Sequence, residues 1–199
     1  MKKTLLVISL LISGILPMNA RRFTFGVELG AGSPVVSYHS FSYKLDMGYR
    51  VSDRQWSVPA FPVAFAYVKF GYMVTPVLET AISVGYEGIS RDERAIPVML
   101  KLSVYPSGME NGGICFFAGG GVMIPDNLKS RVTFGGHVGG GWRFPLSSVV
   151  ALEPFLRLSL NTRYPDLYDP DTELKIPSEN IYLNRMFQGT VSAGFCVSF

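Results

Sequence analysis

Apolar and polar residues alternate along eight separate stretches of this chain, and this pattern constrains its fold more than any other feature. The stretches cover residues 23–31, 63–73, 78–90, 95–105, 113–124, 131–144, 150–163 and 187–199. The chain ends in "GTVSAGFCVSF", in which Phe199, Val197 and Phe195 occupy every second position. A period of two is typical of a β-strand whose two faces meet different surroundings. The sequence therefore predicts an all-β protein.

The first residues, 1–20, have the features of a secretory signal peptide. Two lysines are followed by an apolar run from about Leu5 to Leu16, and a small residue, Ala20, ends the segment. Such a run is too short to cross a membrane as a helix. Cleavage after Ala20 would leave a single mature domain over 21–199, with the net charge lowered from +3 to +1 by the loss of the two lysines. This charge gives no reason to expect a nucleic-acid partner.

Charged residues lie deep within the alternating stretches, on the face opposite nearly all the large apolar side chains. They are Glu28, Lys69, Glu79, Glu87, Lys101, Arg131, Arg143, Glu153 and Arg157. Aromatic residues on the apolar face gather near the ends of the stretches, as they do at the two interfaces of a membrane barrel. A soluble, lipocalin-like barrel would instead enclose the apolar face. We therefore expect the apolar face to meet lipid and the charged face to line a barrel interior.

The number and length of the stretches predict an eight-stranded antiparallel up-and-down transmembrane β-barrel, because a tilted strand crosses a bilayer with about 9–11 residues. Three connections are short ("TPV", "PSGMENG" and "PLSS"), whereas those near 34–62 and 164–186 are long. Short turns on one side and long loops on the other are typical of outer-membrane barrels. We expect both termini in the periplasm and the long loops outside the cell. The alternating segment 39–51 is interpreted as a hairpin in the first long loop, and a ten-stranded barrel is the alternative.

Three features of the sequence together point to a known family. They are the signal peptide, the consecutive strands "FFAGGGV" and "FGGHVGGGWRFPLSSVVALEPFLRLSL", and the terminal Phe199. With these features, residues 22–199 resemble the small eight-stranded outer-membrane barrels of the OmpA/OmpX type in Gram-negative bacteria. The resemblance implies a place in the bacterial outer membrane, contact with its lipids and lipopolysaccharide, and Phe199 as the assembly signal for the barrel-assembly machinery. It does not give an activity, because this fold includes anchors, adhesins, narrow pores and lipid-modifying enzymes.

The interior of an eight-stranded barrel is just wide enough to be filled by side chains. The interior charges must pair there, because an unpaired buried ion destabilises the fold by several kcal/mol. Both signs are present, which favours a structural plug of ion pairs, and a narrow gated ion path is the alternative. His137 shares this face and is interpreted as a hydrogen-bonded structural residue of the same charge network, rather than a proton relay. No second histidine lies close enough in the pattern for a metal site.

Polar residues in the expected loops do not match a known catalytic site. His39, Ser40, Ser90 and Asp92 fall in these loops, and two outer-membrane enzyme families that act on lipid A use histidine and serine. The histidine and serine spacing of the deacylases is absent here, so no catalytic residue is assigned.

An acidic cluster lies in the last long loop. It consists of Asp166, Asp169, Asp171 and Glu173. The cluster lacks the glycine-containing spacing of an EF-hand and is interpreted as a solvated loop, with a divalent-cation or lipopolysaccharide-bridging site as the alternative. We expect no metal and no cofactor.

The two cysteines are expected to be free and buried. Cys115 and Cys196 face the interior from stretches that are three strand spacings apart, or about 14 Å along the wall. A disulfide needs Cα atoms within about 7 Å.

Taken together, these observations predict an integral outer-membrane protein with a structural or surface-interaction role. Its extracellular loops would carry that role through a possible ligand outside the cell. A narrow ion-conducting pore and a lipid A-modifying enzyme are the alternatives.

Overall fold

The computed structural model describes residues 22–45, 48–59, 61–89, 93–126, 131–169 and 174–199, so the expected signal peptide lies outside the described residues. The strands of this part are β1 (Phe23–Lys44), β2 (Arg50–Ser57), β3 (Val63–Thr75), β4 (Leu78–Gly88), β5 (Arg94–Val104), β6 (Gly113–Pro125), β7 (Thr133–Pro145), β8 (Ala151–Arg163) and β9 (Ile181–Ser198). One turn of 3₁₀-helix, η1 (Ser178–Asn180), precedes β9. Within the described residues, no helix has the length and apolar character needed to cross a membrane.

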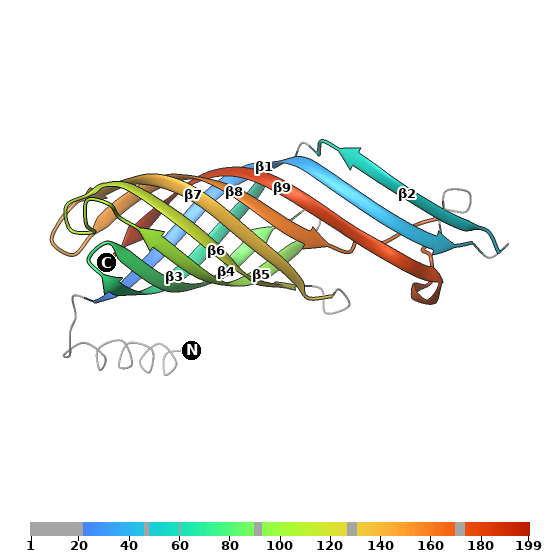
Figure 1. The fold of residues 1–199 in the computed structure, drawn as a ribbon, viewed down its shortest axis with the longest axis horizontal. Coiled ribbons are helices and arrows are strands. Elements are labelled where there is room, and N and C mark those ends of the chain that lie inside the picture. Colours follow the sequence, from blue (N-terminus) through green and yellow to red (C-terminus); the bar gives the residue numbers. More distant parts are fainter. Residues whose placement is uncertain (1–21, 46–47, 60, 90–92, 127–130, 170–173) are drawn as a thin grey trace, which may run out of the picture.

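Eight of these strands close into an antiparallel barrel (Figure 1). The wall runs in the order β1-β3-β4-β5-β6-β7-β8-β9, and β1 pairs with β9 to close it. This closure confirms the predicted eight-stranded barrel. β2 pairs with β1 outside the closed wall, so the ten-stranded alternative is wrong.

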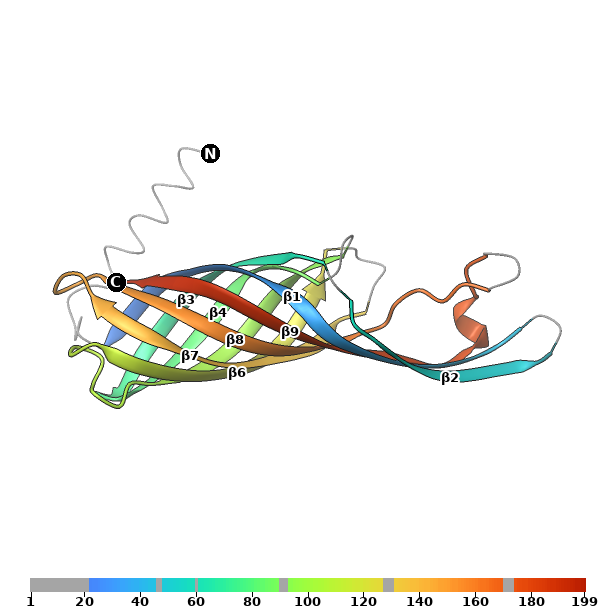
Figure 2. The ribbon, with the colours of Figure 1, turned by 90° about the horizontal axis from the view of Figure 1, so that it is seen from above.

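β1 and β9 are longer than the other wall strands and continue past the rim of the barrel. β1 has 22 residues and β9 has 18, whereas β3 has 13 and β4 has 11. Beyond the rim, 37–44 of β1 pairs with β2 on one side and with 181–188 of β9 on the other. We call these three segments the projecting sheet, which Figures 1 and 2 show standing clear of the barrel. The segment 34–62, expected as a long loop, is therefore mostly strand, and the first arm of the expected hairpin continues a wall strand.

A β-bulge in β1 separates the wall from the projecting sheet. The register between β1 and β9 shifts between Pro34 and Val36. Pro34 has no N–H group to donate to the ladder, so proline favours such an irregularity. The extra residue reverses the alternation: before it, even-numbered residues such as Glu28 face the interior, and after it, odd-numbered residues such as Ser37 do.

Burial alternates along the wall strands as the sequence predicts. In β3, Val63, Phe65, Tyr67 and Lys69 are buried, while Phe70 on the other face is 61 % exposed. The same alternation gives the barrel an apolar outer wall, which suits a lipid bilayer. It confirms that the apolar face looks outwards.

Arg131 does not follow this scheme, and its expected position in the interior is wrong. β7 begins only at Thr133, so Arg131 lies before the strand and is exposed. Its guanidinium group lies 6.0 Å from the ring centre of Tyr164.

The C-terminus lies at the end of the barrel away from the projecting sheet (Figure 1). The backbone N–H of Phe199 donates to the carbonyl oxygen of Phe25 at 2.7 Å, and their ring centres are 6.1 Å apart. The rings of Phe23 and Tyr72 contact each other at 5.2 Å on the same rim. This end therefore carries a row of aromatic rings, as expected at one interface of a membrane barrel.

Candidate functional sites in the barrel and the projecting sheet

Four ion pairs lie inside the barrel and join eight of the interior residues expected from the sequence. They are Lys69–Glu79 at 3.0 Å, Lys101–Glu28 at 2.5 Å, Arg157–Glu87 at 3.2 Å, and Arg143–Glu153. Their side chains are at most 11 % exposed. Each charge has a contacting partner of opposite sign, which offsets much of the free energy lost when an ion is buried.

The pair of Lys69 and Glu79 is the most deeply buried, with 0 % of either residue exposed. The carboxylate of Glu79 also accepts hydrogen bonds from the Tyr105 hydroxyl group at 3.2 Å and from the Thr24 hydroxyl group. Three donors therefore satisfy this carboxylate, as a buried anion requires.

Arg143 ties several elements together near the C-terminal end of the barrel. Its guanidinium group donates to the Glu153 carboxylate and, at 2.8 Å, to the hydroxyl oxygen of Ser198. Its Nε donates to the backbone oxygen of Met109 at 2.9 Å, and the group lies 5.6 Å from the ring centre of Tyr105. One side chain thus links β7, β8, β9 and the β5–β6 connection across the interior.

Aromatic rings fill the middle of the interior, a feature not predicted from the sequence. The buried cluster consists of Phe65, Tyr67, Phe117, Phe155 and Cys196. The rings of Phe117 and Phe155 meet edge to face at 5.5 Å. In the middle of the barrel, the expectation that nearly all large apolar side chains lie on the outer face is therefore wrong. The alternation itself contains the signal, because Phe65 and Tyr67 occupy the same alternate positions as Lys69.

The interior cations lie against these rings as well as against carboxylates. Lys101 Nζ is 4.2 Å from the ring centre of Phe117, and the Arg157 guanidinium group is 3.8 Å from that of Phe65. Contacts between cations and ring faces are attractive, more so when water is excluded. The aromatic cluster and the ion pairs therefore form one packed plug.

Little space remains within this plug. The cavity bordered by Lys101, Tyr105, Phe117 and Cys196 measures about 10 Å³, close to the minimum that one water molecule needs. Side chains therefore fill the interior at this level.

Toward the projecting sheet, the interior holds several polar side chains beside a small apolar cluster of Ile89, Ala95, Met99 and Met123. Among the described residues, the hydroxyl groups of Ser37, Ser159 and Ser192 and the Nε of Arg157 are buried without a hydrogen-bond partner in the protein. Groups of this kind are usually satisfied by ordered water. His137 pairs with Ser159 across the strands, at the same level, and its ring meets that of Phe117 edge-on at 5.9 Å.

No disulfide joins the two cysteines, and the described residues contain no cluster of side chains that could bind a metal ion. Cys115 in β6 and Cys196 in β9 are both free and buried. Within the described part of the chain, no three His, Cys, Asp or Glu side chains come together in a way that could hold a metal ion.

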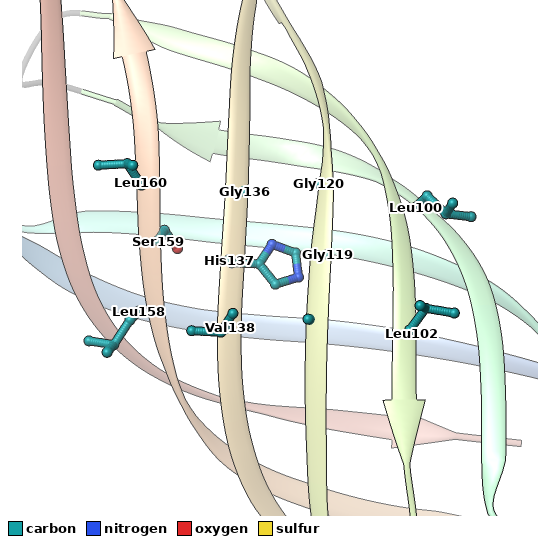
Figure 3. A pocket seen from close by; sticks show the side chains of 11 residues that line it. Leu100, Leu102, Gly119, Gly120, Gly136, His137, Val138, Leu158, Ser159 and Leu160 are labelled. Carbon is teal, nitrogen blue, oxygen red and sulfur yellow. The ribbon is translucent and has the colours of Figure 1, made fainter.

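The outer wall has an apolar hollow of about 590 Å³ over β6 and β7. Gly120 and Gly136, which are direct partners, form its floor, because neither carries a side chain. Leucines border it on both sides: Leu100 and Leu102 from β5, and Leu158 and Leu160 from β8 (Figure 3). The hollow shapes the lipid-facing wall and offers little polar surface for chemistry.

The segment before β9 folds over one face of the projecting sheet. Leu167 and Ile176 form a buried cluster with Tyr43, and Phe41 and Ile181 pack against it. This small core is separate from the barrel interior. The projecting sheet is therefore held by side-chain packing as well as by its backbone ladder.

His39 and Ser40 lie on opposite faces of the projecting sheet and do not form a catalytic pair. His39 Nε2 is hydrogen-bonded to Asn184 Oδ1 at 2.9 Å. Ser40 pairs with Arg54 and Arg185 on the other face. Ser90 and Asp92, the other two polar loop residues noted in the sequence, lie outside the described residues.

In the acidic segment, Asp166 is paired with a cation. Its carboxylate accepts a hydrogen bond from Lys175 Nζ at 2.8 Å, which raises the pKa of that amine above its usual value. Both side chains are more than half exposed. Asp171 and Glu173 lie outside the described residues.

β2 forms the exposed edge of the projecting sheet. All of its residues except Val51 are exposed. Asp53 accepts hydrogen bonds from the Gln55 side chain at 2.9 Å and from the Arg54 backbone N–H at 2.7 Å, and these lower the pKa of its carboxyl group.

Comparison with known proteins identifies the fold. No family model and no curated protein sequence matches the chain. The outer membrane protein OprG from Pseudomonas aeruginosa is similar in structure, with a TM-score of 0.51 and 15 % identity over 89 % of this chain and 95 % of that one. Neisserial surface protein A and the outer membrane protease OmpT from Escherichia coli give TM-scores of 0.44 and 0.43 at 15 % and 8 % identity, each over 88 % of this chain and 97 % of theirs. The chain has the fold of an outer-membrane β-barrel.

Proposed function

We propose that this protein is a surface-interaction protein of the bacterial outer membrane, in which the barrel is an anchor and the projecting sheet is the binding surface. The unbroken continuation of β1 and β9 beyond the rim carries this proposal. A segment that only connected two wall strands would need no paired strands and no core of its own. A preformed surface loses less conformational entropy on binding than a mobile loop does.

The filled interior supports an anchor rather than a pore. Ion pairs and aromatic rings occupy the middle of the barrel, and about 10 Å³ remains between Lys101 and Cys196. A hydrated ion cannot pass through a space of that size. The protein should therefore give no discrete conductance steps in planar bilayers, and regular steps that change on Arg157→Ala would favour the pore.

The proposed orientation places the projecting sheet outside the cell and both ends of the barrel domain in the periplasm. Outer-membrane barrels have short periplasmic turns and longer external connections. The β3–β4 and β7–β8 turns lie at the same end as Phe199, and the projecting sheet stands at the other (Figures 1 and 2). In this orientation Phe199 lies where the barrel-assembly machinery would read it as the assembly signal.

The projecting sheet also supports binding rather than catalysis. Its histidine, His39, is bonded to Asn184, and the neighbouring Ser40 points to the opposite face. A nucleophilic serine needs a base within hydrogen-bond reach. We therefore assign no enzymatic activity, and a lipid A-modifying reaction is the less supported alternative.

Replacement of residues 45–57 by a short glycine–serine linker tests the proposal, because it removes β2 and leaves the wall strands in place. Cells carrying this variant and cells carrying the unchanged protein are compared for retention on immobilised glycans and matrix proteins. We expect weaker retention on at least one coated surface at equal amounts of barrel in the membrane. The same linker inserted after Ser148, in a turn at the other end, is the matched control. Equal retention of all three strains on every surface would overturn the proposal.

A further inference from the structure

A row of aromatic side chains marks the level at which the projecting sheet leaves the wall. Phe187, Tyr38 and Trp56 are direct partners across β9, β1 and β2, and the rings of Tyr38 and Trp56 lie 4.7 Å apart. On the other side Phe187 pairs with Thr162 of β8, whose hydroxyl group bonds the backbone of Phe134 in β7. The row therefore extends along the wall as far as Phe134 in β7. Aromatic rows at the end of an apolar wall lie at the membrane interface.

Two arginines and a serine form the next row on the same face. Arg54, Ser40 and Arg185 are direct partners across β2, β1 and β9. Each lies two residues beyond the aromatic row, or about 6–7 Å along the strand. Neighbouring strands are about 4.8 Å apart, so the two arginines start roughly 10 Å from each other on either side of the serine hydroxyl group. Both guanidinium groups can reach one anion placed over Ser40.

These two arginines carry no carboxylate partner, unlike the cations of the interior. Among the described residues, neither Arg54 nor Arg185 takes part in an ion pair. The neighbouring carboxylate, Asp53, lies on the opposite face of the sheet and is bonded to Gln55. Arg185 lies 5.7 Å from the ring centre of Phe187, and its side chain is exposed.

We propose that Arg54, Ser40 and Arg185 bind the phosphate group of a membrane lipid. Guanidinium groups bind phosphate through paired hydrogen bonds, and a serine hydroxyl group adds a third donor. The lipid-facing wall continues directly into this face, so hydrocarbon chains packed along β1 and β9 bring a headgroup to the height of the arginine row. This position favours a lipid phosphate over a free one. The choice of leaflet rests on the proposed function, which places the projecting sheet outside the cell. The arginine row then lies at the outer leaflet, and the ligand is a phosphorylated glycolipid of that leaflet.

Binding can be measured on the purified mature protein without reference to its orientation. Native mass spectrometry counts the lipid A molecules retained by the protein in detergent, using lipid A with both phosphates and lipid A with both removed. Trp56 gives a second readout, because Trp142→Phe removes the other of the two tryptophans and Trp56 lies beside the arginine row. We expect the phosphorylated form to bind about tenfold more tightly or better, and to shift the Trp56 emission.

The double variant Arg54→Gln/Arg185→Gln should lose this preference for the phosphorylated lipid. The matched control, Arg22→Gln/Arg50→Gln, removes the same charge; Arg22 lies at the other end of the barrel, and Arg50 is already bonded to Ser42 at 3.0 Å. The control should keep the preference. Equal binding of the two lipids by the unchanged protein, or an equal loss in both double variants, would overturn the proposal.

An excess of inorganic phosphate provides a separate arm. If it displaces the lipid and itself shifts the Trp56 emission at the same concentration as the lipid does, the site takes free phosphate and the lipid assignment is wrong. If the lipid-binding measurements fail while the removal of β2 still weakens the retention of cells on a coated surface, the lipid site alone is overturned. If lipid binding is as expected but cells lacking β2 are retained as well as cells with the unchanged protein, the proposed function alone is overturned.

Discussion

Lys69→Met removes the cation from the most deeply buried ion pair of the barrel. At the observed 3.0 Å, and with an effective dielectric constant of about 20, the attraction between Lys69 and Glu79 amounts to about 5–6 kcal/mol. Methionine avoids the desolvation of the ammonium group, and Glu79 keeps its bonds to Tyr105 and Thr24. Losing one partner of a buried pair costs about 3–5 kcal/mol in proteins. We expect the free energy of unfolding to fall by about 3 kcal/mol, at the lower end of that range.

Urea unfolding of the protein in phospholipid vesicles, followed by tryptophan fluorescence, measures this loss. Lys175→Met is the matched control, because Lys175 and Asp166 are 2.8 Å apart but 60 % and 54 % exposed. It should leave the stability unchanged within error, since exposed pairs contribute little. In Lys69→Met/Glu79→Gln the orphaned carboxylate is also gone, so this variant should be no less stable than Lys69→Met. A stability of Lys69→Met equal to that of Lys175→Met, or a double variant less stable than Lys69→Met, would contradict this prediction.

Two further outcomes follow from the packing of the barrel and a third from the backbone ladder of the projecting sheet. Gly121→Ala should destabilise the barrel by about 1–3 kcal/mol, because the new Cβ would lie 2.0 Å from a backbone oxygen of β5. Gly120→Ala is the control and should not destabilise it, because its Cβ would meet nothing nearer than 3.7 Å. Equal unfolding midpoints of the two variants would contradict this prediction. Phe155→Ala should lower the unfolding free energy by about 3–5 kcal/mol, and a loss below 1 kcal/mol would mean that the aromatic cluster is not packed as described. Backbone amides of 37–44 should exchange with deuterium as slowly as those of the wall, whereas exchange at the rate of a turn would show that the projecting sheet is not ordered.

Alternation predicts the barrel well because a wall between lipid and a packed interior imposes the same period on every strand. Glu28 and Lys101 illustrate this: their positions in alternating stretches place both in the interior, although they are 73 residues apart. The pairing partners do not follow from the pattern. Which carboxylate meets which cation depends on strand stagger, and a period of two contains no information about stagger.

The projecting sheet shows where this kind of prediction ends. Pro34 and the bulge beside it reverse the phase of alternation in β1, so residues after it change faces relative to a strand read straight through. The pairing of Ser40 with both Arg54 and Arg185 depends on this shift and on the length of β9. Neither can be inferred from a local pattern, because both result from contacts between distant segments.

The proposed function requires the projecting sheet to stand on the cell surface. A cysteine introduced by Ser52→Cys, on the exposed strand β2, reports this directly when intact cells are treated with a membrane-impermeant maleimide. The native thiols, Cys115 and Cys196, are buried and should not react in the folded barrel. We expect full labelling of the variant on intact cells and no labelling of the unchanged protein. Labelling that requires permeabilisation of the outer membrane would contradict it.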